Sequence, residues 1–237
     1  MRTLVLIAAV LLTGLFSACD KVKGDGPVLT DNRAIADFNE IESNISGEVE
    51  VTFGGSYRVE VEAAENIREL TETKVVDGKL IIRFKKPVTI GPNETFTVRV
   101  FTPYLESLTL AGSGNMRLMN ALRTTGLKLE LSGSGNIELP SYFGAELEVR
   151  LPGSGNIRIH QGSVIDERIV LSGSGNIDLE NLEARRADVQ LTGSGNIHLF
   201  VTGDLNALIS GSGNIFYRGT PVINSEITGS GALVHLD

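Results

Sequence analysis

Apolar and polar residues alternate over short segments along most of this chain, which is the pattern of β-strands with one buried face. Four early segments show it: Val49–Phe53, Tyr57–Val61, Leu80–Phe84 and Phe96–Val100. Residues 76–79, Val-Asp-Gly-Lys, have the composition of a hairpin turn, and only residues 65–72 suggest a helical turn. The pattern predicts an all-β protein.

From residue 110 onward the alternation recurs around one tetrapeptide, Gly-Ser-Gly-Asn. Its first glycine stands at positions 112, 133, 153, 173, 193 and 211, and a seventh copy at 229 has Ala in place of Asn. The spacings are 21, 20, 20, 20, 18 and 18 residues, and alternating segments flank each copy. A unit this short cannot bury its own apolar face, but a stack of such units can. The repeat therefore predicts a parallel β-helix, or β-solenoid, with coils of 18 to 21 residues.

Parallel stacking places equivalent positions of successive coils about 4.8 Å apart, which predicts continuous rows of side chains. Two rows are apolar and would face inward: Leu110, Leu131, Leu151, Leu171, Leu191, Ile209 and Ile227; and Met116, Ile137, Ile157, Ile177, Ile197, Ile215 and Leu233. Two outward rows alternate in charge: Arg117, Glu138, Arg158, Asp178 and His198; and Lys128, Glu148, Arg168 and Asp188. Opposite charges at this spacing are stabilising, which favours the parallel stack over an antiparallel meander of hairpins.

The tetrapeptide suits a tight corner between two strands. Glycine adopts positive φ at little cost, Asn tolerates the left-handed region, and stacked Asn side chains can hydrogen-bond from coil to coil. The expected corner residues are Gly112, Gly114, Asn115, Gly133, Gly135, Asn136, Gly153, Gly155, Asn156, Gly173, Gly175, Asn176, Gly193, Gly195, Asn196, Gly211, Gly213 and Asn214.

The amino end has the layout of a secretory signal peptide. Arg2 precedes an apolar run from Leu4 to Leu12, and small residues lead to Cys19, the only cysteine of the chain. This resembles the lipobox of bacterial lipoproteins, in which the cysteine carries the lipid; a soluble secreted protein is the alternative. We expect a signal peptide over 1–18, a flexible tether over 19–27 and a single β-solenoid domain over 28–237, degenerate over 28–110 and regular over 111–237.

Composition argues against several classes of activity. The net charge of −8 offers no basic footprint for nucleic acid. One cysteine allows no disulfide within the chain, and His160, His198 and His235 fall at different places in their repeats, without ligand spacing. Calcium-binding β-rolls repeat an Asp-containing motif every nine residues, unlike the neutral motif here. No metal site and no cofactor are expected.

Catalytic motifs are also few. Gly-Ser-Gly does not fit the Gly-x-Ser-x-Gly nucleophile elbow, because it leads into a strand and not a helix. The sharpest enzyme hypothesis is a polysaccharide lyase or hydrolase whose carboxylates lie together on the β-helix. Its candidates are Asp166, Glu167, Asp178, Glu180 and Glu183. A solvated acidic face is the simpler interpretation, because short coils leave no length for the loops of a catalytic cleft.

The run from Thr102 to Asn115, the serial Gly-Ser-Gly-Asn-Ile copies, Phe38–Ile41 and Asp77–Leu80 resemble the head GIN domain family of auto-transporter adhesins. The resemblance covers nearly all of the chain after Cys19. It implies a β-helix-like domain of bacterial envelope proteins, frequent in the Bacteroidetes, without established catalytic residues.

Together these features favour a non-enzymatic, lipid-anchored protein of the bacterial cell envelope, an outer-membrane lipoprotein facing the periplasm or the surface. Adhesion or matrix binding is the first reading, a periplasmic structural or assembly role the second, and a polysaccharide-acting enzyme the third. The expected partners are the membrane, through a lipid on Cys19, and a glycan or another envelope protein. Identical turn hydroxyls form a candidate contact ridge, for which Ser154, Ser174 and Ser194 are the central residues.

Overall fold

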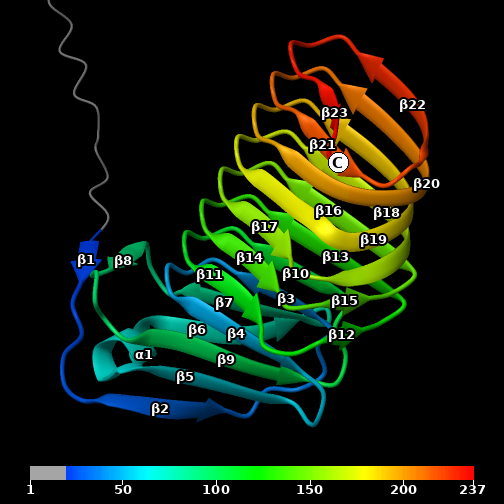
Figure 1. Cartoon of the computed structure of the whole chain (residues 1–237). Helices are drawn as coiled ribbons and strands as arrows, with labels where there is room; N and C mark the ends of the chain where they lie inside the picture. The colour runs from blue at the N-terminus through cyan, green and yellow to red at the C-terminus, as the bar shows by residue number, and fades with distance from the viewer. Residues whose placement is uncertain (1–19) are drawn as a thin grey trace, which may run out of the picture.

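The computed structural model describes residues 20–237, and in them the chain winds into a stack of β-coils (Figure 1). The predicted all-β solenoid is confirmed. The expected signal peptide, residues 1–18, and the lipidated Cys19 lie outside the described residues. The segment expected as a flexible tether begins with a short strand, β1 (Asp20–Val22), which pairs in parallel with β8 (Val88–Ile90).

Strands of successive coils pair in parallel along three ladders. The first ladder, before the corner, contains β7 (Lys79–Phe84), β3 (Glu40–Ser43), β10 (Ser107–Leu110), β13 (Gly126–Leu131), β16 (Glu146–Leu151), β18 (Gly162–Leu171), β19 (Asn176–Leu191), β20 (Ile197–Ile209) and β22 (Val222–Ile227). The second, after the corner, contains β9 (Phe96–Thr102), β4 (Glu48–Phe53), β11 (Asn115–Leu118), β14 (Asn136–Leu139), β17 (Asn156–Ile159), the first part of β19 and of β20, β21 (Ile215–Arg218) and β23 (Leu233–His235). A short third ladder joins β12 (Leu122–Arg123) and β15 (Tyr142–Phe143) to the beginning of β18 and, through it, to the middle of β19.

The predicted register is confirmed. In the first apolar row Leu110 pairs with Leu131 and Leu171 with Leu191; in the second, Ile137 pairs with Ile157. Nearly all members of both rows are fully buried, since they fill the interior of the coils from one end of the stack to the other. This continuous apolar interior is what holds the coils together.

The glycines of the corner serve a different purpose from the one expected. None of the corner glycines or asparagines has positive φ; in the described chain that conformation occurs elsewhere, for example at Gly162 and Gly219. Instead, the corners of successive coils approach so closely that a Cβ on Gly155 would overlap the carbonyl oxygen of Gly135. A Cβ would overlap the preceding corner in the same way at the other repeats. The corners lie this close because their backbones hydrogen-bond to each other, as where the Ser154 amide donates to the Gly133 carbonyl at 3.1 Å. Glycine is required here because the neighbouring backbones leave no space for a side chain.

The degenerate half differs from the regular stack in two ways. The strands β3 and β4, early in the sequence, are inserted between the coil of β7 and β9 and the coil of β10 and β11. The free edge is then covered by antiparallel strands: β5 (Arg58–Ala64) on β9, β2 (Val28–Arg33) on β5, and β6 (Thr71–Val76) on β7 through the predicted hairpin. The expected helical turn is α1 (Glu65–Leu70). The amino end of the stack is therefore capped (Figure 1).

Candidate functional site

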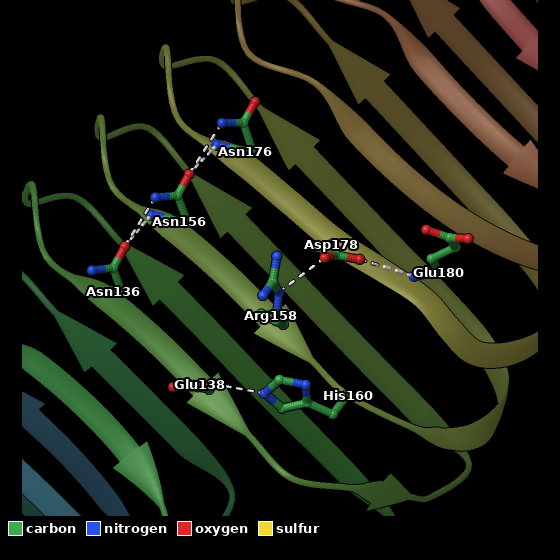
Figure 2. A network of polar contacts seen from close by, with 8 residues as sticks. All are labelled: Asn136, Glu138, Asn156, Arg158, His160, Asn176, Asp178 and Glu180. Atoms are coloured by element: carbon green, nitrogen blue, oxygen red, sulfur yellow. Dashed lines mark hydrogen bonds and ion pairs between the residues drawn. The ribbon is translucent and has the colours of Figure 1, made fainter.

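One face of the solenoid carries a ladder of asparagines, and we call it the asparagine face: Asn115, Asn136, Asn156, Asn176, Arg117, Glu138, Arg158, Asp178 and His198, around a shallow hollow of about 520 Å³. Figure 2 shows its centre. The Asn136 side-chain oxygen accepts from the Asn156 backbone amide at 3.2 Å and from its side-chain amide at 3.0 Å. Asn156 accepts from Asn176 in the same way. The predicted amide ladder is confirmed, and it uses most of the hydrogen-bonding capacity of the corner asparagines.

Beside the ladder runs the predicted row of alternating charges. Arg158 lies between Glu138 and Asp178 in the parallel register and forms an ion pair with Asp178 at 2.9 Å (Figure 2). The His160 ring contacts the Glu138 carboxylate at 2.6 Å, and this hydrogen bond lowers the pKa of Glu138. The alternation of charge continues into the amino-terminal half of the stack, since Glu50 pairs in register with both Arg99 and Arg117. The charges of the asparagine face therefore largely neutralise one another.

A second concave feature, the long groove, has a volume of about 860 Å³ and follows the first ladder across several coils. Two outward rows line it: Glu146, Asp166, Arg186 and Asp204; and Lys128, Glu148, Arg168, Asp188 and Asn206. The second row has the predicted alternation, although Lys128 and Glu148 form their ion pairs within their own strands, with Glu130 and Arg150. Arg186 binds Asp166 through two hydrogen bonds of 2.5 and 2.7 Å, which lower the pKa of the Asp166 carboxyl. Tyr104, 65% exposed, is among the residues that line this groove.

Glu167 lies under the groove in an inward row and not on a solvated acidic face. It pairs in register with Leu147 and Ala187, it is only 3% exposed, and neither carboxylate oxygen has a hydrogen-bond partner in the part of the chain that the structure describes. Burial away from water disfavours the charged form and raises the pKa of Glu167 to about 8. An acid in this position is neutral over most of the acidic and neutral pH range.

The carboxylates proposed for an enzymatic site are not brought together. Asp166 and Glu167 belong to the first ladder, Asp178 to the second and Glu183 to the third, while Glu180 lies in β19 between Asp178 and Glu183. Asp166 and Asp178 are engaged by arginines, and Glu180 lies 3.6 Å from Arg218. The pair of free carboxyl groups that glycoside cleavage requires is therefore absent from this set.

The three histidines also lie apart from one another. His160 contacts Glu138, the His198 ring stacks on Phe216 at 4.7 Å, and His235 contacts the Gly219 carbonyl at 3.0 Å. Over residues 20–237, no group of three or more His, Cys, Asp or Glu side chains is arranged to hold a metal ion. In the same part of the chain no helix has the length and apolar character needed to cross a membrane.

The turn serines form an exposed row along the edge of the asparagine face: Ser113, Ser134, Ser154, Ser174, Ser194, Ser212 and Ser230. The backbone amides of the five serines from Ser154 onward bind the preceding coil, as at Ser174, which donates to Gly153 at 3.2 Å. Within the described residues, their hydroxyls make no hydrogen bond to another protein atom. These seven hydroxyls are thus directed to solvent at intervals of about one coil spacing.

These features define a parallel β-helix that presents fixed polar surfaces. The carboxylates proposed for catalysis do not form a catalytic group in it. A family model described as "Putative auto-transporter adhesin, head GIN domain" matches residues 37–221. The chain belongs to this family, as its motifs predict.

Solved structures of similar fold are named as adhesins and, in one case, as a lipid binding protein. A putative adhesin from Bacteroides fragilis is 24% identical, with a TM-score of 0.86 over 91% of this chain and 100% of that chain. A putative adhesin from Parabacteroides merdae is 22% identical, with a TM-score of 0.72 over 92% and 100%. A chain from Parabacteroides distasonis named a putative lipid binding protein is 24% identical, with a TM-score of 0.74 over 92% and 100%. At these identities the likeness establishes the fold alone. A search of the curated proteins found no match.

Proposed function

We propose that this protein is a non-enzymatic, lipid-anchored component of the bacterial cell envelope that binds a partner through its solenoid surface, in adhesion or matrix binding. The row of turn serines carries the proposal. Seven exposed serines, whose hydroxyls bind no other protein atom among residues 20–237, repeat along one edge of the stack, whereas the neighbouring asparagines and charges already satisfy one another. Unpaired donors and acceptors held in fixed positions suit recognition, because little ordering entropy is lost when a partner binds.

Binding is favoured over catalysis by the state of the carboxylates. A general acid or base acts within hydrogen-bond reach of a substrate and needs a pKa near the working pH. Asp166 and Glu138 have lowered pKa values because of Arg186 and His160. Glu167 has a raised pKa but is buried. None of the three combines access with a suitable pKa.

Replacing Ser154, Ser174 and Ser194 together by Ala should weaken attachment to the partner surface by about tenfold or more, since each lost hydrogen bond contributes roughly 0.5–1.5 kcal/mol. The melting temperature should stay the same, because these hydroxyls bind no protein atom within residues 20–237. Attachment of cells to immobilised host matrix, with and without the triple variant, measures the first effect, and thermal unfolding measures the second. Undiminished attachment, or a loss of stability, assigns the serines to the scaffold.

Replacing Cys19 by Ser should release the protein from the membrane. The proposal places the lipid on this residue, and without an acyl chain the described domain has no helix that could hold it in the bilayer. Partition between detergent and aqueous phases measures the effect, and a Cys19→Ser protein that still follows the detergent contradicts the anchor. Protease added to intact cells then separates a surface-facing protein from the periplasmic alternative, because only the former is digested.

A further inference from the structure

The residues at one part of the long groove form a rigid aromatic platform. Tyr104 is 65% exposed, yet its loop is fixed. The hydroxyl of the fully buried Thr102 donates to the Tyr104 carbonyl at 2.7 Å and lies 3.3 Å from the Tyr104 amide. Phe53, which also lines the groove, is tied to Asn120 by two hydrogen bonds of 3.0 and 2.8 Å between backbone and side chain. A large aromatic held in water on a fixed loop is suited to stacking against a ligand.

The polar groups along the groove are held in place by one another. Arg186 is fixed by Asp166, Asp188 accepts from the Asn206 side chain at 2.8 Å, and the Arg123 guanidinium lies 4.2 Å from the centre of the Phe143 ring. Arg168 lies between Glu148 and Asp188 in register but forms no ion pair among residues 20–237, so its donors remain available. Four coil spacings separate the levels of Lys128 and Asn206, so the longer row runs for about 19 Å.

The charges of the groove indicate the class of ligand. Its lining contains four basic side chains and six exposed acidic ones, with both signs mixed, so a polyanion gains no net attraction. The acids do not form one uninterrupted stripe for a basic peptide, because Arg186 lies between Asp166 and Asp204 in register and Arg168 between Glu148 and Asp188. The groove also lacks a cluster of exposed aliphatic side chains of the kind that anchors protein partners. An uncharged ligand with many hydroxyl groups satisfies both the donors and the acceptors.

We propose that the long groove binds an extended, uncharged oligosaccharide, with one sugar ring stacked on Tyr104 and its hydroxyls bonded by the two polar rows. This inference goes beyond the proposed function, because it adds a binding surface separate from the serine row and names the class of its ligand. Each sugar offers an apolar ring face for the tyrosine and hydroxyls that both donate and accept. The groove spans several coils, which suits a chain and not a single small molecule.

The test is calorimetric titration of the purified full chain with uncharged hexasaccharides of glucose, mannose, xylose and N-acetylglucosamine. We expect at least one to bind with a dissociation constant below about 1 mM. Tyr104→Ala should weaken that binding by at least about tenfold, and Tyr104→Phe, which keeps the ring, by less than about twofold. Both variants should have the same melting temperature as the wild type, because the Tyr104 side chain is exposed. If no hexasaccharide binds, or if Tyr104→Ala binds as well as the wild type, the proposal is overturned.

Polygalacturonate fragments and a lysine-rich peptide serve as charged competitors. Tight binding of either one in preference to the uncharged sugars also overturns the proposal. The variant with Ser154, Ser174 and Ser194 replaced by Ala should titrate like the wild type, because these serines do not line the groove. Sugar binding can thus fail while serine-dependent attachment holds, or hold while attachment fails, and the two results separate this inference from the proposed function.

Discussion

Gly155→Ala should destabilise the solenoid by about 3 kcal/mol or more, whereas Gly126→Ala should leave its stability unchanged or raise it by up to about 1 kcal/mol. A methyl group on Gly155 would occupy the position of the Gly135 carbonyl oxygen. The same methyl on Gly126 meets only the Glu146 Cβ, at 3.8 Å, which is ordinary contact. The two substitutions are chemically identical, so their difference measures the approach of backbones at the corner. Urea unfolding followed by circular dichroism gives both values.

A graded variant covers the case in which Gly155→Ala does not fold. Gly231 stands at the last corner and would meet the Gly213 carbonyl in the same way. The terminal coil has a neighbour on one side only, so it can move away from the clash, and Gly231→Ala should lose less stability than Gly155→Ala. Equal effects at Gly126, Gly155 and Gly231 would contradict the close approach.

The regular stack was predictable because its repeats carry several independent signals in the same register. The apolar rows, the alternating charges and the recurring Asn all select one alignment of coils, and the pairs Ile137–Ile157 and Glu138–Arg158 follow from it. The role of the corner glycines was not predictable in the same way. Positive φ and close approach of backbones both select glycine, so residue type alone does not separate them.

The order of coils in the amino-terminal half could not be predicted from the alternation of apolar and polar residues. The tetrapeptide is missing there, so no marker shows that Glu40–Ser43 lies between Lys79–Phe84 and Ser107–Leu110. The antiparallel cap has the same local alternation as the parallel strands, and only contacts between distant segments distinguish them. The exposed position of Tyr104 could not be predicted, because it is a single loop residue outside every repeated row.

Glu167, in contrast, could have been recognised from the sequence. The outward row contains Lys128, Glu148 and Arg168, so the residue before each of these must face inward. Those preceding residues are Leu127, Leu147 and Glu167. The alternation that places Arg168 on the outside therefore places the acidic side chain of Glu167 in the interior.

Glu167→Leu should stabilise the protein strongly, and more so in alkaline than in acidic solution. Its pKa is raised from an ordinary value of 4.5 to about 8, so the folded protein keeps a proton that the unfolded chain releases. The contribution of Glu167 to wild-type stability should therefore be most favourable below pH 4.5, fall as the pH rises towards 8, and level off above it. The difference between the two pKa values corresponds to roughly 5 kcal/mol at pH 8 and above. Leucine removes this dependence and packs between Leu147 and Ala187.

Two further variants separate the charge from the packing. Glu167→Gln cannot ionise, so its stability should lose the slope between pH 4.5 and 8, but its buried amide lacks partners and it should remain less stable than the leucine variant. Glu183→Leu, at an exposed position, should change stability by no more than about 0.5 kcal/mol at any pH. Urea unfolding from pH 5 to 9 measures all four proteins. A wild-type stability that rises across this range, or that has the same slope in Glu167→Leu, would mean that the Glu167 carboxylate is solvated or paired, because an unpartnered acid in an apolar interior can only lose stability when its proton is removed.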